Sequence, residues 1–344
     1  MVSLSIISVA VIIIVFVLRH GAGIALRGFG RGPLCAPTDL TTAAAAEPPL
    51  WVAGGLWEES SLVSFTLALP LPAQSFVAEF MSSSGGIWAK VESMIFLNIL
   101  TSPKVRHAAG VVVDVGANLG YFSALSIALG YRVIALEPQP RAQPFLVATA
   151  RRNGFRNDRF SLYGCAVGGT RGTVEMINSA RWEVDGVSIV RPDEASKAAG
   201  ASPLPSPVGI LVPLVQLADV VPPGEPIALL KIDTEGFERG VFAGITPSLL
   251  ASVRNIIVEV KTAETRLFLM STLAAAGFHC RQYQEEYAKD GVGATLDSKG
   301  RTRTELGSDM ATRLKPCDTV NGADPEDFWF SREDFPWDCS TIGC

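Results

Sequence analysis

The chain has 344 residues, of which 48% are hydrophobic and 18% are charged. This length allows one large domain, or two small ones with an appendage. The 29 Lys and Arg side chains are outnumbered by 34 Asp and Glu, and no run of five or more basic residues occurs. These numbers argue against DNA or RNA as a partner, because a nucleic-acid groove requires clustered positive charge.

The N-terminal segment predicts a membrane anchor. Residues 2–18 contain no charged side chain and consist mainly of Ile and Val, at the lower length limit for crossing a bilayer. We expect residues 1–20 to form an uncleaved single-pass anchor. A cleaved signal peptide is the alternative, since residues 23–25 offer a small-residue cleavage site, although a basic n-region is missing.

Two observations bear on the side of the membrane that the domain faces. Arg19, Arg27 and Arg31 follow the apolar run and favour a cytoplasmic orientation. Four of the six cysteines lie in the last 65 residues, which is typical of disulfides formed in an oxidising lumen such as that of the ER or Golgi. The sequence leaves both orientations open, with the lumenal one as our working expectation.

The rest of the chain divides into a predicted stem and a predicted folded domain. Residues 21–60 are rich in Gly, Ala, Pro and Thr, with four consecutive alanines at 43–46, and predict a flexible stem. Residues 61–344 form the expected domain. It begins with a short strand at 63–69, and helical spacing over 73–100 predicts a lead-in that caps the edge of a sheet.

The domain then alternates short apolar runs with helical segments. Such alternation indicates βαβ units and a parallel sheet. Helices are expected at 121–129, 144–153 and 262–276, and strands at 111–115, 132–136, 160–167, 172–177, 227–232, 255–260, 279–283 and 328–330. Two stretches interrupt the pattern: residues 179–209 predict a surface loop or substrate-side insertion, and residues 284–327 a lid.

A glycine turn follows the strand at 111–115. Gly116 and Gly120 allow the backbone to approach a ligand closely, at the sheet edge where open α/β folds bind their ligands. Glu137 ends the next strand, about 20 residues further on, where a carboxylate accepts hydrogen bonds from a ribose. Turn and acid together predict a nucleoside cofactor site. The alternative is a tight turn beside an ordinary surface acid.

Charged residues also end the strand at 227–232. Asp233 and Glu235 follow it directly, and charge beside a buried strand suggests a polar pocket. The alternative is structural: Lys231 pairs with one carboxylate and Glu238 caps the next helix. Glu259 and Lys261 repeat the pattern at the end of the strand at 255–260, with the same two interpretations.

Other catalytic arrangements find little support. The chain has only three histidines, and no Ser-His-Asp or Cys-His arrangement stands out. No Cys-x-x-Cys pair occurs, so we expect no metal site. The chemistry must therefore depend on carboxylates, Lys or Tyr.

Four sequence blocks in order resemble the FkbM family of S-adenosylmethionine-dependent methyltransferases: 113–122 (VDVGANLGYF), 135–138 (ALEP), 231–238 (KIDTEGFE) and 258–260 (VEV). Residues 213–217 and 328–330 resemble further family segments. The resemblance covers about residues 87–332. It implies an α/β fold of Rossmann-like class I methyltransferase type, with helices on both faces of a seven-stranded, mostly parallel sheet whose last strand is antiparallel.

The resemblance also implies roles for single residues. The methionine part of the cofactor would lie against Asp114, Gly116, Asn118 and Gly120. Glu137 would hold the ribose, and the region of Cys165 and Ala166 would approach the adenine. Asp233 would face the methyl group and, with Glu235, the acceptor; Thr234 is a mild departure, because an aliphatic residue is frequent there.

The resulting hypothesis is a membrane-tethered methyltransferase that uses S-adenosyl-L-methionine and acts on a hydroxyl of a sugar or another small molecule. Asp233 or Glu235 would orient the acceptor or act as base, with Lys261 as a weaker candidate. Two alternatives remain. A nicotinamide-dependent oxidoreductase is less well supported, because the turn lacks the third glycine of the dinucleotide-binding pattern. A non-catalytic binding module would retain the fold but would not convert a substrate.

Overall fold

The computed structural model describes residues 35–45, 49–58, 61–83, 86–107, 110–178, 187–190, 209–283, 314–317 and 326–333. The expected anchor at 1–20 therefore lies outside the described residues, as does most of the insertions at 179–209 and 284–327. Within these ranges, no helix combines the length and the apolar character needed to cross a membrane.

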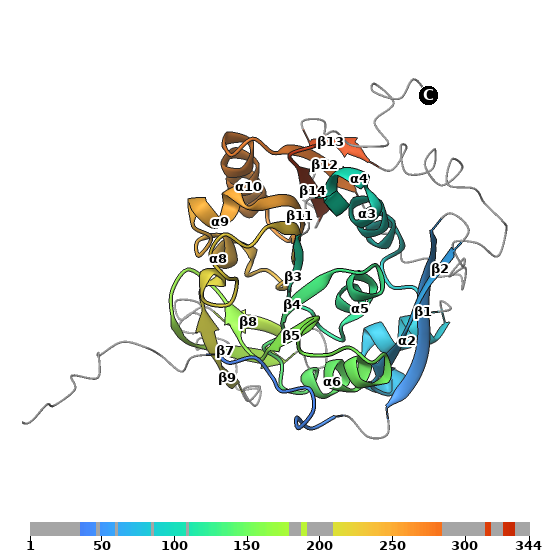
Figure 1. The fold of residues 1–344 in the computed structure, drawn as a ribbon. Helices are drawn as coiled ribbons and strands as arrows, with labels where there is room; N and C mark the ends of the chain where they lie inside the picture. The colour runs from blue at the N-terminus through green and yellow to red at the C-terminus, as the bar shows by residue number, and fades with distance from the viewer. Residues whose placement is uncertain are drawn as a thin grey trace, which may run out of the picture. The chain divides into compact units, whose positions relative to one another are not determined.

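The main sheet has the strand order β13-β12-β14-β11-β10-β3-β4-β5 (Figure 1). Its strands β3, β4, β5, β10 and β11 run parallel, and β14 is antiparallel to both its neighbours. The predicted seven-stranded sheet is confirmed, with β13 as a two-residue addition. The strands are β3 (Val111–Val115), β4 (Arg132–Leu136), β5 (Phe160–Tyr163), β10 (Ile227–Ile232), β11 (Val253–Val260), β12 (His279–Tyr283), β13 (Lys315–Pro316) and β14 (Glu326–Ser331).

The sheet changes direction between β3 and β10. From β3 the chain adds β4 and β5 on one side, and it later returns to place β10 and β11 on the other. The register pairs Asp114 with Lys231 and Val115 with Ile232, so the carboxyl ends of β3 and β10 lie side by side. An open α/β sheet binds its ligands at such a switch point.

Helices cover both faces of the sheet. Val112 belongs to a core cluster with residues of α3, α5 and α6, whereas Val111 and Val113 belong to a second cluster with residues of α8, α9 and α10. Every side chain of β3 and β10 is buried, as expected for parallel strands covered on both faces. The helices are α3 (Lys90–Thr101), α5 (Tyr121–Ala128), α6 (Gln143–Arg152), α8 (Glu238–Phe242), α9 (Pro247–Ala251) and α10 (Ala263–Ala275).

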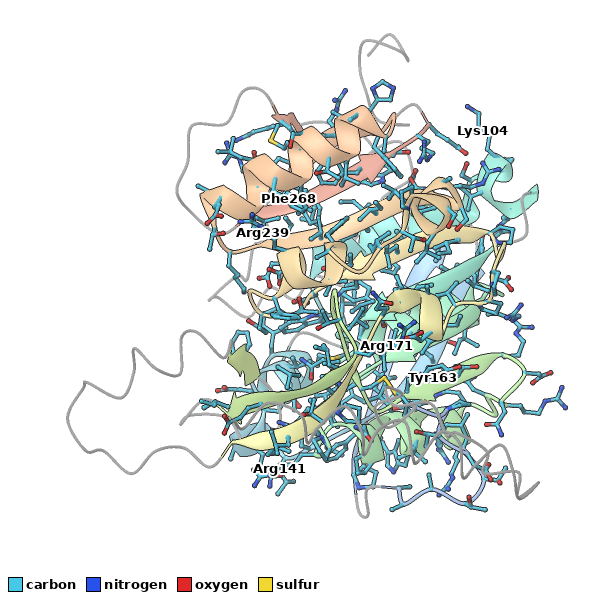
Figure 2. All side chains as sticks on the ribbon, turned by 90° about the vertical axis from the view of Figure 1, so that its left-hand side faces the viewer. Lys104, Arg141, Tyr163, Arg171, Arg239 and Phe268 are labelled. Atoms are coloured by element: carbon cyan, nitrogen blue, oxygen red, sulfur yellow. A yellow bond between two sulfur atoms is a disulfide. The ribbon has the colours of Figure 1, made fainter. Side chains whose placement is uncertain are left out.

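Helices α8 and α10 are held together by a cationic side chain. The Arg239 guanidinium lies over the ring of Phe268, 5.3 Å from its centroid, and also pairs with Glu264 (Figure 2). This fixes the helix that begins directly after the charged loop of β10. The rest of the helical structure is η1 (Pro72–Gln74), α2 (Phe76–Ser83), α4 (Pro103–His107) and η2 (Leu217–Asp219).

The region predicted as a sheet-edge cap is placed differently. Helix α3 contacts β10 and α5 in the middle of the sheet. Its Phe96 stacks on Phe122 of α5, with ring centroids 4.4 Å apart. The prediction of helical structure over 73–100 is confirmed, but its position at the edge is wrong, because an apolar helix gains more by burying its side chains on a sheet face.

The interpretation of residues 21–60 as a flexible stem is wrong for its described part. Residues 50–58 form β1 (Leu50–Glu58), which pairs antiparallel with β2 (Ser61–Leu69) along its whole length. This hairpin lies outside α5 and α6 (Figure 1). The backbone N–H of Ala68 donates to Thr149 Oγ1 at 2.9 Å, and that of Thr66 to Asn153 Oδ1 at 2.8 Å, which attaches β2 to α6.

Residues 35–45 are also part of the fold. Cys35 forms a disulfide with Cys165, and Pro37 bridges antiparallel to Tyr163, so the segment runs along the free edge of β5. Leu40 is buried, and its carbonyl accepts from Arg151 Nε at 2.7 Å. The segment thus covers an edge strand that would otherwise present unpaired backbone groups.

A second sheet has the order β6-β9-β7-β8. The strand predicted at 160–167 is therefore two strands in two sheets, separated at 164–165. The prediction of a strand at 172–177 is confirmed, whereas the strand at 210–215 was not predicted, although 213–217 was matched to the family. The members are β6 (Ala166–Val167), β7 (Gly172–Asn178), β8 (Val187–Val190) and β9 (Ile210–Val215).

Candidate active site

The glycine turn after β3 interlocks with the loop after β10. Gly116 has a φ of +84°, and a Cβ atom there would lie 1.8 Å from the backbone oxygen of Asp233. The Asp233 N–H in turn donates to Val115 O at 3.0 Å. Only glycine fits this position, so the two loops at the switch point form one unit.

Glu137 braces the glycine turn from the end of β4. Its Oε2 accepts from the Asn118 N–H and its Oε1 from the Gln139 N–H, both at 2.7 Å. The carboxyl is 6% exposed, and burial raises its pKa to about 7 against the opposing effect of these two hydrogen bonds. The predicted ribose acid is therefore also the acceptor that holds Asn118 at a φ of +48°.

Two acceptor oxygens at the turn have no donor. Asp114 is buried at the end of β3, and its Oδ2 accepts from Ser123 Oγ of α5 at 2.6 Å. Its Oδ1 and the Oδ1 of Asn118 are buried without a hydrogen-bond partner. Burial raises the pKa of Asp114. Buried acceptors normally have a partner, so these two oxygens are where the donor group of a bound ligand would be expected.

Lys231 and Asp233 form an ion pair at the end of β10. Lys231 Nζ lies 3.0 Å from Asp233 Oδ2 and 5.1 Å from the centroid of the Phe122 ring, and its side chain is only 4% exposed. Burial disfavours the charge, but Asp233, Glu92 and Asp114 raise the pKa of Lys231. The ammonium and a contact with Glu259 keep the pKa of Asp233 low despite its desolvation.

The loop after β10 is held by Glu238. The carboxyl of Glu238 is 1% exposed, and its Oε1 accepts from Thr234 N at 3.2 Å, Thr234 Oγ1 at 3.1 Å and Gly236 N at 2.8 Å. The structural alternative is therefore present for Lys231, which pairs with Asp233, but not for Glu238, which holds the loop and does not cap α8. Between these bonds Glu235 adopts a φ of +54°, a strained conformation for a residue with a side chain.

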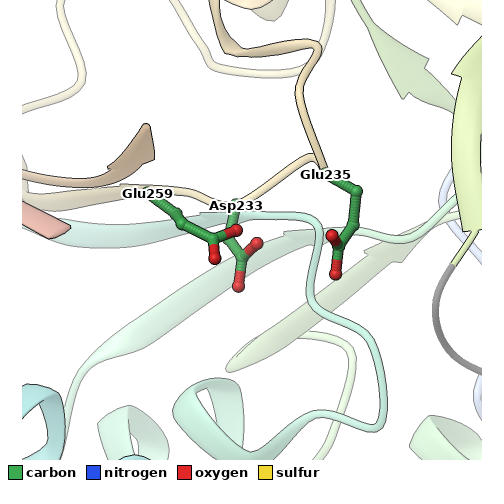
Figure 3. A group of neighbouring side chains, drawn as sticks. All are labelled: Asp233, Glu235 and Glu259. Carbon is green, nitrogen blue, oxygen red and sulfur yellow. The ribbon is translucent and has the colours of Figure 1, made fainter. Parts of the chain in front are cut away.

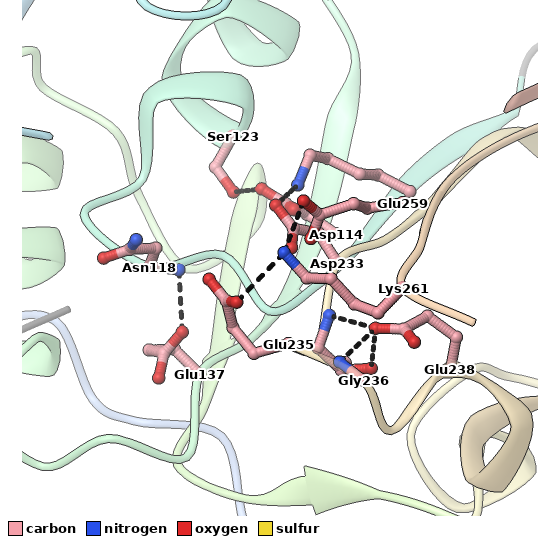
Figure 4. Close-up of polar contacts among 12 residues, drawn as sticks. Asp114, Asn118, Ser123, Glu137, Asp233, Glu235, Gly236, Glu238, Glu259 and Lys261 are labelled. Atoms are coloured by element: carbon pink, nitrogen blue, oxygen red, sulfur yellow. Dashed lines mark hydrogen bonds and ion pairs between the residues drawn. The ribbon is translucent and has the colours of Figure 1, made fainter. Parts of the chain in front are cut away.

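Three carboxyl groups converge at this edge (Figure 3). Single oxygens of Asp233, Glu235 and Glu259 all lie within 4.8 Å of one another. Lys261 Nζ contacts Glu259 Oε1 at 2.6 Å and Glu235 Oε2 at 3.2 Å (Figure 4). Burial and the Asp233 charge raise the pKa of Glu259 to about 9, and burial raises that of Glu235.

The three carboxyl groups are also the donor set in the described residues that resembles a cation site. The ammonium of Lys261 already lies against two of the three, Glu235 and Glu259, and neutralises part of their charge. This carboxylate set has its cation within the chain. The geometry therefore favours acid–base chemistry over a resident metal.

The predicted adenine-side residues are placed in unequal ways. The side chain of Cys165 is fully buried in the disulfide with Cys35 and cannot contact a ligand through a thiol. Ala166 is buried in β6, with its neighbours in a separate core cluster. Both residues are almost completely buried, so the contact of this segment with the adenine stays a prediction.

All other predicted site residues meet at the carboxyl edge of β3, β4, β10 and β11. The sequence did not indicate the roles of Ser123, whose hydroxyl donates to Asp114, and of Glu92, whose charge acts on Lys231. Ser123 lies nine positions after Asp114, at the start of α5. Because the glycine turn brings the start of this helix back to the end of β3, the spacing could have indicated the hydrogen bond between the two side chains. Glu92 lies in α3 and offers no such signal.

Comparison with known families decides the type of domain. Residues 114–282 match the model of the methyltransferase FkbM domain. These residues form an FkbM methyltransferase domain. The match begins at Asp114 and ends within β12, so the FkbM domain contains the glycine turn, Glu137 and the carboxylate cluster. The hairpin β1–β2 and the Cys35 segment precede it.

The chain is similar in sequence or structure to several methyltransferases, at low sequence identity. The chain is 28% identical over 207 residues to methyltransferase sdnD of Sordaria araneosa, an alignment that covers 52% of this chain and 77% of the relative. A crystal structure of methyltransferase FkbM from Methylobacillus flagellatus aligns with 15% identity and a TM-score of 0.35, covering 61% of this chain and 55% of that one. The C-terminal domain of precorrin-6Y C5,15-methyltransferase from Rhodobacter capsulatus aligns with 12% identity and a TM-score of 0.34, covering 72% and 92%.

Proposed function

We propose that the chain transfers a methyl group from S-adenosyl-L-methionine to a hydroxyl of a sugar or another small molecule. The observation that carries this proposal is the pair of donor-free, buried oxygens of Asp114 and Asn118 at the switch point. The amino group of the cofactor's methionine part is a donor of the type that these acceptors lack. Glu137 lies beside them for a ribose, and the carboxylate cluster lies across the edge.

When bound, the cofactor supplies an electrophilic methyl group on a sulfonium. The protein's task is then to align a hydroxyl and to take up its proton. Asp233 suits the second role, because its pKa is held low and its side chain is 36% exposed. Glu235, which is 47% exposed, would hydrogen-bond the acceptor.

Lys261 has a different role in this proposal. Burial disfavours its charge, but Glu235 and Glu259 outweigh that effect and raise the pKa of Lys261. A lysine that stays protonated cannot accept a proton. It would instead hold the two glutamates in place and balance the negative charge of the cluster.

Calorimetric titration of the purified chain with S-adenosylmethionine and S-adenosylhomocysteine tests the cofactor, with NAD as the competing ligand. We expect binding of the first two only. Asp114→Asn should weaken it, because the variant replaces an acceptor with a donor, whereas Asp158→Asn, at an exposed ion pair with Arg156, should not. Binding of NAD alone, or of no ligand at high excess, would overturn the proposal.

The acceptor is proposed as a glycan or another small molecule. Incubating glycan and small-molecule pools with the chain and methyl-labelled cofactor would identify the fraction that gains label. Label found only in protein or nucleic acid would contradict this acceptor class. Label in no fraction, with the cofactor bound, would favour the non-catalytic module.

We also propose that residues 2–18 hold the domain at a membrane, on an oxidising side. The support is the uncharged Ile- and Val-rich run together with two disulfides, Cys35–Cys165 and Cys280–Cys317. Disulfides persist in oxidising compartments. Alkaline extraction of membranes from expressing cells, followed by thiol labelling under denaturing conditions, tests both parts. Extraction into the supernatant would refute the anchor, and label on Cys35, Cys165, Cys280 and Cys317 would refute the oxidising side.

A further inference from the structure

Glu259 is a member of the carboxylate cluster to which no role has been given. It stands one residue before the end of β11, between Asp233 of the neighbouring β10 loop and Lys261. Its side chain is 26% exposed, its Oε1 lies 2.6 Å from Lys261 Nζ, and a carboxyl oxygen of Glu259 lies within 4.8 Å of one of Asp233. It therefore contacts the proposed base on one side and a fixed cation on the other.

The charge of the cluster favours a retained proton. Asp233, Glu235 and Glu259 could carry three negative charges, whereas Lys231 and Lys261 supply two positive ones. Lys231 is further shared with Asp114 and Glu92. Carboxyl groups that share a site disfavour one another's ionisation, so the pKa of at least one of them is raised.

The geometry indicates which group keeps the proton. Asp233 contacts one ammonium directly and lies near the second, so its ionised form is the best stabilised. Glu259 is desolvated beside that charge, and only Lys261 opposes the effect, so its pKa rises to about 9. Two facing carboxyls with one proton form an acid–carboxylate pair, in which the acid donates and the carboxylate accepts.

We infer that Glu259 is a positioning residue that, as a neutral acid, donates a hydrogen bond to Asp233 and thereby aims the remaining lone pairs of Asp233 at the acceptor hydroxyl. This inference rests on the proposed function for the direction of the proton, although the protonation of Glu259 stands without it. In the transfer step the acceptor oxygen forms a bond to the methyl carbon, and the sulfur–methyl bond breaks with its electron pair left on sulfur. The hydroxyl proton passes to Asp233, and Glu259 keeps its own.

The groups that face Glu259 determine its titration. From the β10 loop these are Asp233 and Glu235, and from its own strand end Lys261. Lys231 acts through Asp233. On the other side, Asp327 of β14 is the cross-strand partner of Glu259, so its charge also faces this edge.

The experiment is an infrared titration of the full chain from neutral pH to above pH 9, since the protonated carboxyl has a C=O band that ionisation removes. We expect a loss of this band near pH 9 in the wild type, and no such loss in Glu259→Gln. Glu225→Gln is the matched control, because Glu225 is a partly buried, ion-paired glutamate outside the cluster; it should titrate as the wild type does. A wild type without a band lost near pH 9, or a band that persists in Glu259→Gln, would overturn the inference.

Turnover of the acceptor pool with methyl-labelled cofactor tests the positioning role of Glu259. Gln can still donate to Asp233, so Glu259→Gln should keep kcat within about threefold at neutral pH and lose the alkaline inflection of the pH profile. Glu259→Ala should lower kcat by about 10- to 100-fold with an unchanged affinity for S-adenosylhomocysteine. Equal loss in both variants would refute a neutral donor. A wild-type chain that binds no cofactor would refute the proposed function instead. The infrared titration would still decide whether Glu259 is protonated at neutral pH.

Discussion

The carboxyl edge of the sheet has two halves with similar parts and different connections. The β3–β4 half contains Asn118, at a φ of +48°, and Glu137, whose pKa is raised to about 7. The β10–β11 half contains Glu235, at a φ of +54°, and Glu259, whose pKa is raised to about 9. Each half thus combines a residue at a positive φ with a carboxyl whose pKa is raised.

The two halves differ in the groups that Glu137 and Glu259 contact. Glu137 accepts from two backbone N–H groups, which cannot titrate, so the contact fixes the turn. Glu259 contacts Asp233 and Lys261, which are themselves ionisable, so a proton gained by one changes the others. A carboxyl held by backbone maintains a shape, and a carboxyl held by charged side chains can take part in proton transfer.

The largest expected effect concerns the covalent links of the two halves. Cys35–Cys165 closes 130 residues around the β3–β5 half, and Cys280–Cys317 closes 37 at β12. The loop-entropy model gives about 5 kcal/mol for the first and about 4 kcal/mol for the second. Urea unfolding of the two paired Cys→Ser variants should show this order, and only the first should weaken binding of S-adenosylhomocysteine. A larger loss of stability without Cys280–Cys317 than without Cys35–Cys165 would contradict this prediction.

The second prediction separates the interlocked turn from an ordinary one. Gly116→Ala should lower the free energy of unfolding by about 4 kcal/mol, because its Cβ would meet the backbone of Asp233. Gly224→Ala is the control, since Gly224 has a similar φ of +75° and no atom within 4 Å of a new Cβ. It should cost only about 1 kcal/mol. Equal losses would mean that the two loops are not one unit.

The third prediction uses the pH dependence of the β3–β4 half. Because the pKa of Glu137 rises from 4.5 to about 7 on folding, the native state keeps a proton that the unfolded chain releases. Its contribution to stability is complete below pH 4.5 and is lost as pH rises towards 7, by roughly 3 kcal/mol. Glu137→Gln should flatten this part of the profile in ligand-free protein, measured by unfolding at each pH. If Glu137 instead made the protein more stable as pH rises from 4.5 to 7, burial would not be the dominant influence on its pKa.

The smallest effect tests whether backbone bracing is confined to one half. Glu238 accepts from the Thr234 and Gly236 N–H groups in the β10–β11 half, as Glu137 does in the other. Glu238→Gln keeps one acceptor and loses the charge, which should cost about 1.5 kcal/mol in unfolding. Turnover should fall more than affinity for the cofactor, since the loop holds Asp233 and Glu235. An unchanged stability would mean that the loop after β10 is held by Lys261, through its ion pair with Glu235, and not by Glu238.

The sequence predicts the main sheet well and the outer elements poorly. Buried parallel strands are short continuous apolar runs, and 111–115 and 227–232 have this pattern without interruption. The strand β1 contains Gly54 and Gly55, which suggested a stem. Its glycine is instead a packing requirement, because a Cβ at Gly54 would lie 2.6 Å from the Phe65 ring. Such a contact depends on a partner strand that the local pattern does not specify.

The site is predictable as a set of residues and not as a set of contacts. Parallel strands bring Asp114, Glu137 and Asp233 to one edge whatever their order. The sharing of charge among Asp233, Glu259 and Lys261 depends on β11 lying beside β10, which is a property of the sheet order. The disulfide of Cys165 likewise requires the distant segment at residue 35 to fold back.

That segment also sets an order of events in biosynthesis. The edge of β5 and the partner thiol do not exist when Cys35 is made, because Cys165 follows 130 residues later. At usual rates of synthesis this interval is roughly 10 seconds, during which the Cys35 thiol has no native partner. The first part of the described chain therefore cannot reach its place until Cys165 has been made, and no other cysteine lies between the two positions to compete for the Cys35 thiol.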